Sequence, residues 1–167
     1  MSQRRLCALA AVTTAGAIGA VFGLSASAAA VTPATATASF DCGTWGSGSA
    51  TLTAADSGGV KSIRFDSSAI KIPPDTFVDP NTLTTTARFT KNGGSTPDAV
   101  FSGTVNPPMD PGSDVTIGPI PLTSANLSAG DTTNSYTAAW SIRIQPPGGV
   151  AAVDCTATSS QSSAFTW

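Results

Sequence analysis

The 167-residue sequence contains no histidine and no glutamate, so every acidic side chain is an aspartate. Without histidine, Ser-His-Asp and Cys-His catalytic machinery is excluded, as are zinc sites of the usual composition. Without glutamate, a catalytic carboxylate pair could only be Asp with Asp, and no motif in the chain supports one. These absences favour a non-enzymatic protein. The open alternative is a secreted hydrolase that uses some of Asp66, Asp75, Asp79, Asp110 and Asp114.

Positive charge is also scarce, with eight Lys and Arg in the whole chain. Arg4 and Arg5 precede an apolar stretch, Leu6 to Leu24, and small residues follow up to Ala30. This order is typical of a signal peptide, which we place at residues 1–30. Removing its two arginines leaves six scattered cations against ten Asp, a net charge of −4. Such a chain is a poor partner for nucleic acid. We expect a secreted protein with no stable membrane insertion after signal cleavage.

Cysteine is sparse as well: there are three, and Cys7 falls within the expected signal peptide. The other two, Cys42 and Cys155, each lie in phase with inward-facing residues of a strand-like run, Phe40 and Val153 respectively. Two such thiols in an oxidising compartment are expected to pair. We therefore predict a Cys42–Cys155 disulfide, between neighbouring strands or between two sheets. Closing so long a loop would stabilise the fold by roughly 4–5 kcal/mol in the chain-entropy model.

Helix-forming residues are few beyond the signal, whereas Thr and Val are abundant, and apolar residues alternate with polar ones in several short runs. One run places Leu83 and Phe89 on one face, and the longest, 136–144, places Tyr136 and Trp140 with the isoleucines on an inward face. The pattern predicts an all-β fold, an antiparallel immunoglobulin-like β-sandwich of about 7–9 strands. We assign residues 31–39 to a flexible lead-in and 40–167 to a single domain.

Six of the twelve prolines form three pairs, each after a strand-like run: Pro73-Pro74, Pro107-Pro108 and Pro146-Pro147. Because proline cannot donate to a β-ladder, each pair is expected to end its strand and begin a loop.

Trp45 is the candidate ligand contact, in a glycine-rich loop just after Cys42. An exposed tryptophan at this position could stack on a sugar ring, as in carbohydrate-binding modules. The favoured interpretation is that Trp45 folds back over the disulfide and the open end of the core.

Aspartate also clusters with Pro, Asn and Gly at 75–81 and 110–114. Neither cluster has the ligand spacing of a calcium loop. Aspartate before proline or glycine more often shapes a turn through its own hydrogen bond. We therefore expect no metal and no cofactor, with calcium as the less favoured interpretation.

The segments Phe40-Asp41-Cys42 and Val153-Asp154-Cys155 pair an apolar residue with each cysteine near the two ends of the mature chain. In this the sequence resembles small secreted single-disulfide β-sandwich proteins of high-GC Gram-positive bacteria, a group without assigned activity. The resemblance implies a location and a fold. We expect an extracellular or cell-surface binding or structural module, with cell-wall polysaccharide or a surface protein as its partner.

Overall fold

The computed structural model describes residues 30–124 and 126–167. The expected signal peptide at 1–30 lies outside the described residues except for Ala30. The described residues form one short 3₁₀ helix and ten strands: β1 (Thr35–Asp41), η1 (Gly43–Trp45), β2 (Ser47–Ser57), β3 (Val60–Lys71), β4 (Thr84–Lys91), β5 (Ala99–Gly103), β6 (Asp114–Ser124), β7 (Thr132–Ser135), β8 (Trp140–Gln145), β9 (Val153–Ala157) and β10 (Phe165–Thr166).

The predicted immunoglobulin-like sandwich is wrong, because the strands close into an antiparallel barrel. Eight strands follow one another around the ring in the order β4-β5-β6-β3-β2-β1-β9-β8, and β8 pairs with β4 to complete it. The closing ladder runs from Thr84↔Gln145 to Ala87↔Ile142. Alternation predicts one buried face for each strand, and a sandwich satisfies this as well as a barrel does. The all-β class is confirmed. Whether the sheet closes into a barrel depends on which strands pair, here on the pairing of β8 with β4.

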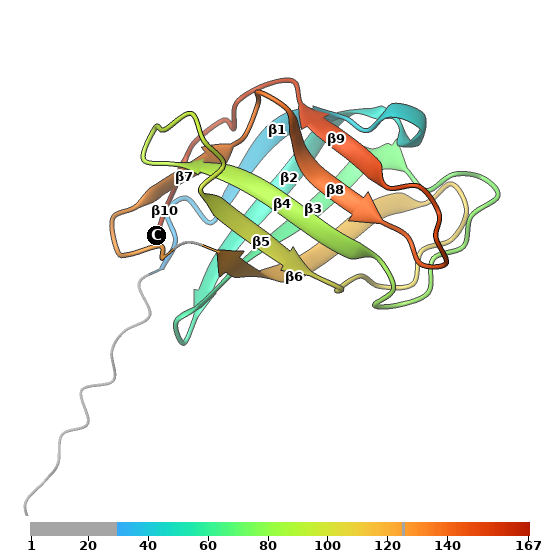
Figure 1. The fold of residues 1–167 in the computed structure, drawn as a ribbon, viewed down its shortest axis with the longest axis horizontal. Helices are drawn as coiled ribbons and strands as arrows, with labels where there is room; N and C mark the ends of the chain where they lie inside the picture. The colour runs from blue at the N-terminus through green and yellow to red at the C-terminus, as the bar shows by residue number, and fades with distance from the viewer. Residues whose placement is uncertain (1–29, 125) are drawn as a thin grey trace, which may run out of the picture.

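Two strands, β7 and β10, lie outside the ring (Figure 1). β7 uses the same edge of β4 as β8 does, but further along, where it pairs with Phe89–Lys91. β10 pairs with β7, and a single bridge joins Thr166 to Thr32. One edge of β4 therefore has two successive neighbours, with a change of neighbour at Arg88.

The alternation around β4 is confirmed, since Leu83, Thr85, Ala87 and Phe89 are all buried. The interior also holds edge-to-face aromatic pairs, one of which joins Phe89 to Phe101 with ring centroids 5.5 Å apart. Burying one side chain of this size contributes about 1.5–3 kcal/mol relative to leaving it exposed.

The single strand predicted over 136–144 is wrong. β8 begins only at Trp140, and a register shift between Trp140 and Ile142 brings Ser141 inward beside Ile142. A bulge of this kind reverses the facing of every residue before it. Trp140 and Tyr136, predicted to face the core, therefore lie half-buried on the outer wall.

The prediction of a flexible lead-in at residues 31–39 also needs correction, because this segment contains most of β1. β1 begins at Thr35 and pairs with β2 along its whole length, from Thr35↔Thr53 to Asp41↔Ser47. The folded domain therefore begins before residue 40.

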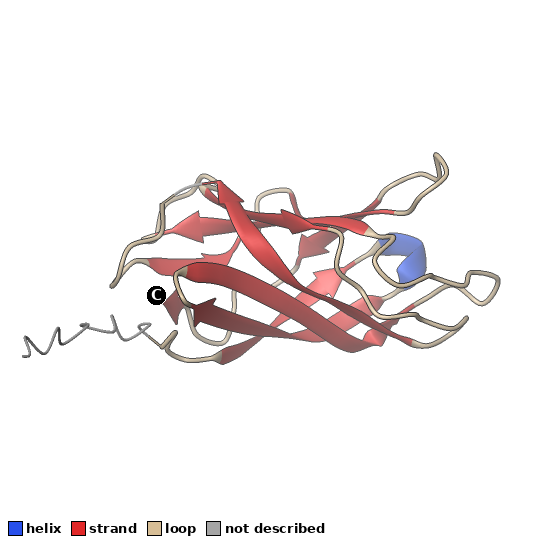
Figure 2. Ribbon diagram, turned by 90° about the horizontal axis from the view of Figure 1, so that it is seen from below, coloured by secondary structure: helices blue, strands red, loops and turns tan. Residues whose placement is uncertain are grey.

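All three proline pairs follow strand ends, as predicted: β3 ends at Lys71, β5 at Gly103 and β8 at Gln145. Because each of these strands is separated from the next by one antiparallel neighbour, the three run in the same direction. Their exit loops therefore gather at one end of the barrel. Figures 1 and 2 show this end opposite the C terminus, with η1 beside the loops.

The Cys42–Cys155 disulfide is confirmed and joins neighbouring strands, with Cα atoms 4.0 Å apart. Both cysteines are buried, and they continue the β1–β9 register from Phe40↔Ala157 and Asp41↔Thr156. Across the part of the chain that the structure describes, no helix has the length and apolar character needed to cross a membrane.

Candidate functional site

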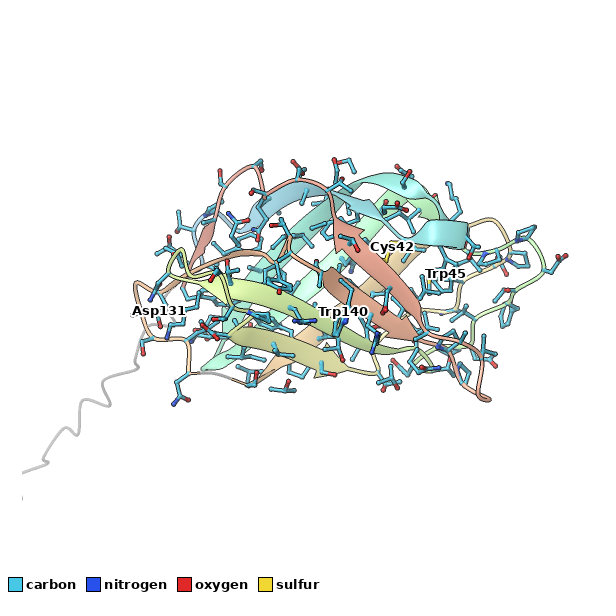
Figure 3. All side chains as sticks on the ribbon, turned by 45° about the horizontal axis from the view of Figure 1, so that its top comes forward. Cys42, Trp45, Asp131 and Trp140 are labelled. Carbon is cyan, nitrogen blue, oxygen red and sulfur yellow. A yellow bond between two sulfur atoms is a disulfide. The ribbon has the colours of Figure 1, made fainter. Side chains whose placement is uncertain are left out.

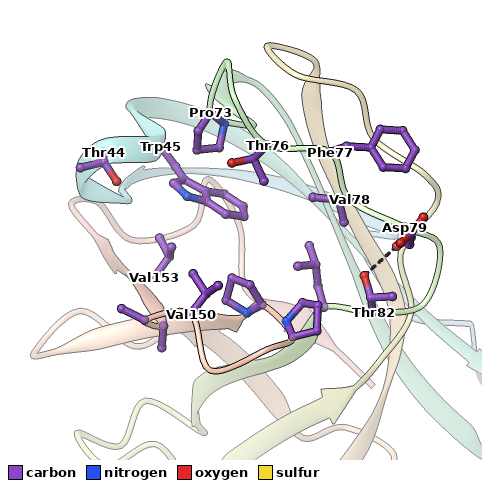
Figure 4. A pocket seen from close by; sticks show the side chains of 15 residues that line it. Thr44, Trp45, Pro73, Thr76, Phe77, Val78, Asp79, Thr82, Val150 and Val153 are labelled. Carbon is purple, nitrogen blue, oxygen red and sulfur yellow. Dashed lines mark hydrogen bonds between the residues drawn. The ribbon is translucent and has the colours of Figure 1, made fainter.

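A cavity opens at the loop end of the barrel and has a volume of about 460 Å³ (Figure 4). Three segments line it: η1, the loop that follows β3, and the loop that joins β8 to β9. Most of the lining side chains are apolar, and Asp79 is the one charged residue among them. We call this cavity the barrel mouth.

Trp45 reaches the barrel mouth because the turn that carries it is tight and anchored to the disulfide. The Cys42 N–H donates to the Gly46 carbonyl at 2.9 Å, and the Trp45 N–H donates to the Cys42 carbonyl at 3.3 Å. Gly46 has a φ of 103° and lies against the Ala69 carbonyl, so a side chain there would be strained and crowded. The turn therefore places Trp45 next to Cys42 (Figure 3), with its indole ring directed into the cavity (Figure 4).

Trp45 is only 6% exposed, as the favoured interpretation expected, and its ring points into the cavity rather than presenting a face to solvent. Its indole N–H has no acceptor among the described residues, whereas the Trp167 N–H donates to Thr133 Oγ1 at 2.9 Å. The hydroxyls of Thr44 and Thr76 also line the cavity and have no side-chain hydrogen bond within the described residues. The barrel mouth therefore offers a few free polar groups, the Trp45 N–H among them, in mostly apolar surroundings.

The wall opposite Trp45 is held in shape by Asn106, a buried residue of the loop after β5. Its side-chain oxygen accepts from the N–H groups of Thr82 and Leu83, both at 2.9 Å. Its amide nitrogen donates to the Asp79 carbonyl at 2.8 Å, and Thr82 Oγ1 donates to the same carbonyl at 2.8 Å. This network satisfies the backbone of the loop, so the wall is preformed.

The rim of the barrel mouth carries two large apolar side chains, Phe77 and Val150, each 57% exposed. They come from different loops, and Val78 and Val153 continue the apolar surface inward from them. Sequence reasoning identified Trp45 but not these four residues. The sequence signal that could have pointed to these loops is the proline pairs, because they follow strands that all end at the same end of the barrel.

The two aspartate clusters do not bring three carboxylates together. Among residues 30–124 and 126–167, no group of three His, Cys, Asp or Glu side chains is close enough to hold a metal ion. Asp75, Asp79 and Asp110 are exposed loop residues.

Asp66 and Asp114, the remaining candidates for an Asp-based hydrolase, line one shallow groove on the outer wall. Each is already paired with a cation: Asp66 accepts two hydrogen bonds from Arg64, at 2.7 and 2.9 Å, and Asp114 pairs with Lys71. Both carboxylates of this groove are thus engaged by neighbouring cations.

Comparison with protein families, curated proteins and solved structures finds no match to this chain.

Proposed function

We propose that this is a non-enzymatic extracellular binding protein whose ligand site is the barrel mouth. The observation that carries the proposal is the cavity itself: about 460 Å³, mostly apolar, with the Trp45 indole N–H among its few polar groups. Small-molecule sites are typically cavities of roughly 300–1,000 Å³ with apolar walls and a few polar groups, and barrel mouths are a common place for them.

The walls favour a small, mostly apolar and uncharged ligand that carries a hydrogen-bond acceptor. The acceptor would take the Trp45 N–H, and the apolar body would lie between Val78, Leu83 and Val153. Asp79 at the opening disfavours an anion. Sugar stacking on Trp45 is less favoured, because the ring is not presented to solvent.

Two further features support the class of protein. The cavity walls do not hold a nucleophile next to a general base, and the chain has neither histidine nor glutamate to act as that base. A structural disulfide is typical of extracellular proteins.

The test is titration with neutral apolar probes, N-phenyl-1-naphthylamine followed by fluorescence and 1-decanol followed by NMR. We expect saturable one-to-one binding of both, with decanol shifting the Trp45 indole N–H resonance. Trp45→Phe removes the donor and keeps most of the apolar contact, so decanol binding should weaken about 2- to 10-fold.

The matched pair of variants is Ala152→Phe, which narrows the barrel mouth, and Val60→Phe on the exposed β2–β3 hairpin. Ala152→Phe should abolish binding of both probes, and Val60→Phe should leave it unchanged. No saturable binding, or binding that Ala152→Phe does not affect, would reject the barrel mouth as the site.

A further inference from the structure

Arg88 differs from every other cation that the structure describes. The other five Lys and Arg each pair with an aspartate: Lys61 with Asp56 at 2.6 Å, Arg64 with Asp66 at 2.7 Å, Lys91 with Asp131 at 2.8 Å, Arg143 with Asp154 at 2.6 Å, and Lys71 with Asp114. Within residues 30–124 and 126–167, Arg88 alone has no carboxylate in reach, although ten aspartates are present.

The position of Arg88 follows from the change of neighbour along β4. Ala87 pairs with Ile142 of β8, and Phe89 pairs with Ser135 of β7, so residues 136–141 all lie opposite Arg88. Residues 136–139 leave the β4 ladder as a loop, whereas Trp140 begins β8 and pairs with Thr156 of β9. A backbone hydrogen bond from the Tyr136 N–H to the Arg88 carbonyl, 3.3 Å long, fastens the loop to β4.

Tyr136, in the loop before β8, and Trp140, at the start of β8, place two aromatic rings against the Arg88 guanidinium. Its Cζ lies 4.7 Å from the Tyr136 ring centroid and 4.2 Å from the Trp140 ring centroid. Contact with two rings limits the rotamers of the half-buried side chain and orients the guanidinium plane. Arg88 is therefore partly preorganised even though no carboxylate holds it.

The cluster formed by Arg88, Tyr136 and Trp140 carries N–H and O–H donors that make no hydrogen bond to a protein acceptor within the described residues. These donors are the N–H groups of Arg88, the Trp140 indole N–H and the Tyr136 hydroxyl. Arg143, whose Cζ lies 4.6 Å from the Trp140 centroid, instead gives its donors to Asp154 at 2.6 and 2.7 Å. The hydrogen bonds from Arg143 lower the pKa of Asp154 below its ordinary value. Both partners therefore stay charged, and their opposite charges compensate each other. One uncompensated positive charge remains, on Arg88.

We infer that Arg88, oriented by Tyr136 and Trp140, is a binding site for an oxyanion, a carboxylate or phosphate group carried by an extracellular molecule. A guanidinium offers two parallel N–H donors that match the two oxygens of such a group. The mature chain is acidic overall, so nonspecific attraction of anions is absent and this local geometry must provide the affinity. The site lies on the barrel wall and is independent of the barrel mouth.

The experiment is an NMR titration of the mature protein that follows the Arg88 Nε–H and the Trp140 indole N–H. Sodium glucuronate and inorganic phosphate are the two anionic probes, and glucose is the neutral control. We expect saturable shifts with dissociation constants on the order of 1–10 mM for at least one anion, and none with glucose. Shifts with glucuronate alone indicate a carboxylate ligand, and shifts with both anions indicate a general oxyanion site.

Two variants separate a built site from simple charge attraction. Arg88→Lys keeps the charge but loses the planar pair of donors, so affinity should fall at least about 5-fold. The double variant Arg143→Gln with Asp154→Asn removes the neighbouring ion pair without changing the net charge, and it should retain binding. The inference is rejected if neither anion shifts Arg88, if glucose binds as well as glucuronate, or if Arg88→Lys binds as tightly as the unmodified protein.

Discussion

Gly118 lies inside β6, where its φ of 98° is a conformation that side-chain-bearing residues rarely adopt. A Cβ at this position would lie 2.6 Å from the Ile63 carbonyl oxygen and 3.0 Å from the Arg64 Cα. Both obstacles are backbone atoms of β3, next to the register shift between Ile63 and Phe65. The β3–β6 ladder can follow this path only if residue 118 has no side chain.

We therefore predict that Gly118→Ala lowers the free energy of unfolding by about 2–4 kcal/mol, from backbone strain and from the collision with β3. The matched control is Gly112→Ala, since Gly112 has a φ of 74° but open space where a Cβ would lie. It should lose only about 1 kcal/mol. Urea unfolding of both variants measures the difference, and equal losses would show that the close approach to β3 contributes nothing.

Asp131 holds the turn before β7 through three hydrogen bonds. Its carboxylate accepts from Lys91 at 2.8 Å, from the Asn92 amide at 2.8 Å and from the Ser128 N–H at 2.7 Å. These bonds, that of Lys91 first, lower the pKa of Asp131 from 3.8 to about 2.

Because the folded-state pKa of Asp131 is lowered, its stabilising effect is complete above about pH 4 and is lost as the pH falls toward 2. Thermal unfolding from pH 6 to pH 2 should show Asp131→Asn less stable than the unmodified protein at pH 6, with the gap closing toward pH 2. Lys91→Gln should reduce the same gap. A gap that widens below pH 4 would contradict this assignment.

Strand β4 and the segment 136–144 show what alternation can and cannot predict. Around β4 the pattern is correct from Leu83 to Phe89, because the ladder with β5 is unbroken and keeps the facing constant where the neighbour on the other edge changes from β8 to β7. The segment 136–144 has an equally regular pattern, yet it divides between a loop opposite Arg88 and a bulged β8. A single inserted residue reverses facing, and its position depends on the partner strand rather than on the local sequence.

The barrel mouth shows the same limit for loops. The proline pairs correctly predict the ends of β3 and β8, because proline removes a ladder donor wherever the strand lies, whereas β5 ends at Gly103, before Pro107 is reached. The meeting of two of these loops with η1 around one cavity depends on the order of strands in the ring, which local patterns do not encode. Trp45 could be identified from its loop and its proximity to Cys42, but Phe77 and Val150 could not.

The ring as a whole has a short seam between its first and last strands. β1 pairs with β2 over its full length but with β9 only at Phe40↔Ala157 and Asp41↔Thr156. Beyond β9 the contact continues through the hydroxyls of Ser159 and Ser162, each of which accepts from a β1 N–H at 3.0 Å. The disulfide lies at the end of this seam. Among the ring strands that lie far apart in the chain, β1 and β9 have the fewest paired residues, so the disulfide fastens the shortest of these ladders.

We therefore expect the disulfide to protect the seam more than the rest of the barrel. Replacing both Cys42 and Cys155 with Ala should lower the free energy of unfolding by about 3–5 kcal/mol, because the unfolded chain loses a constraint across 113 residues. Hydrogen exchange should rise first in β1 and β9, while β4 and β5 keep their protection. Reduction of the unmodified protein should give the same pattern without any change of sequence. Uniform loss of protection across all strands would mean instead that the barrel opens as one cooperative unit and that the seam is not its weak point.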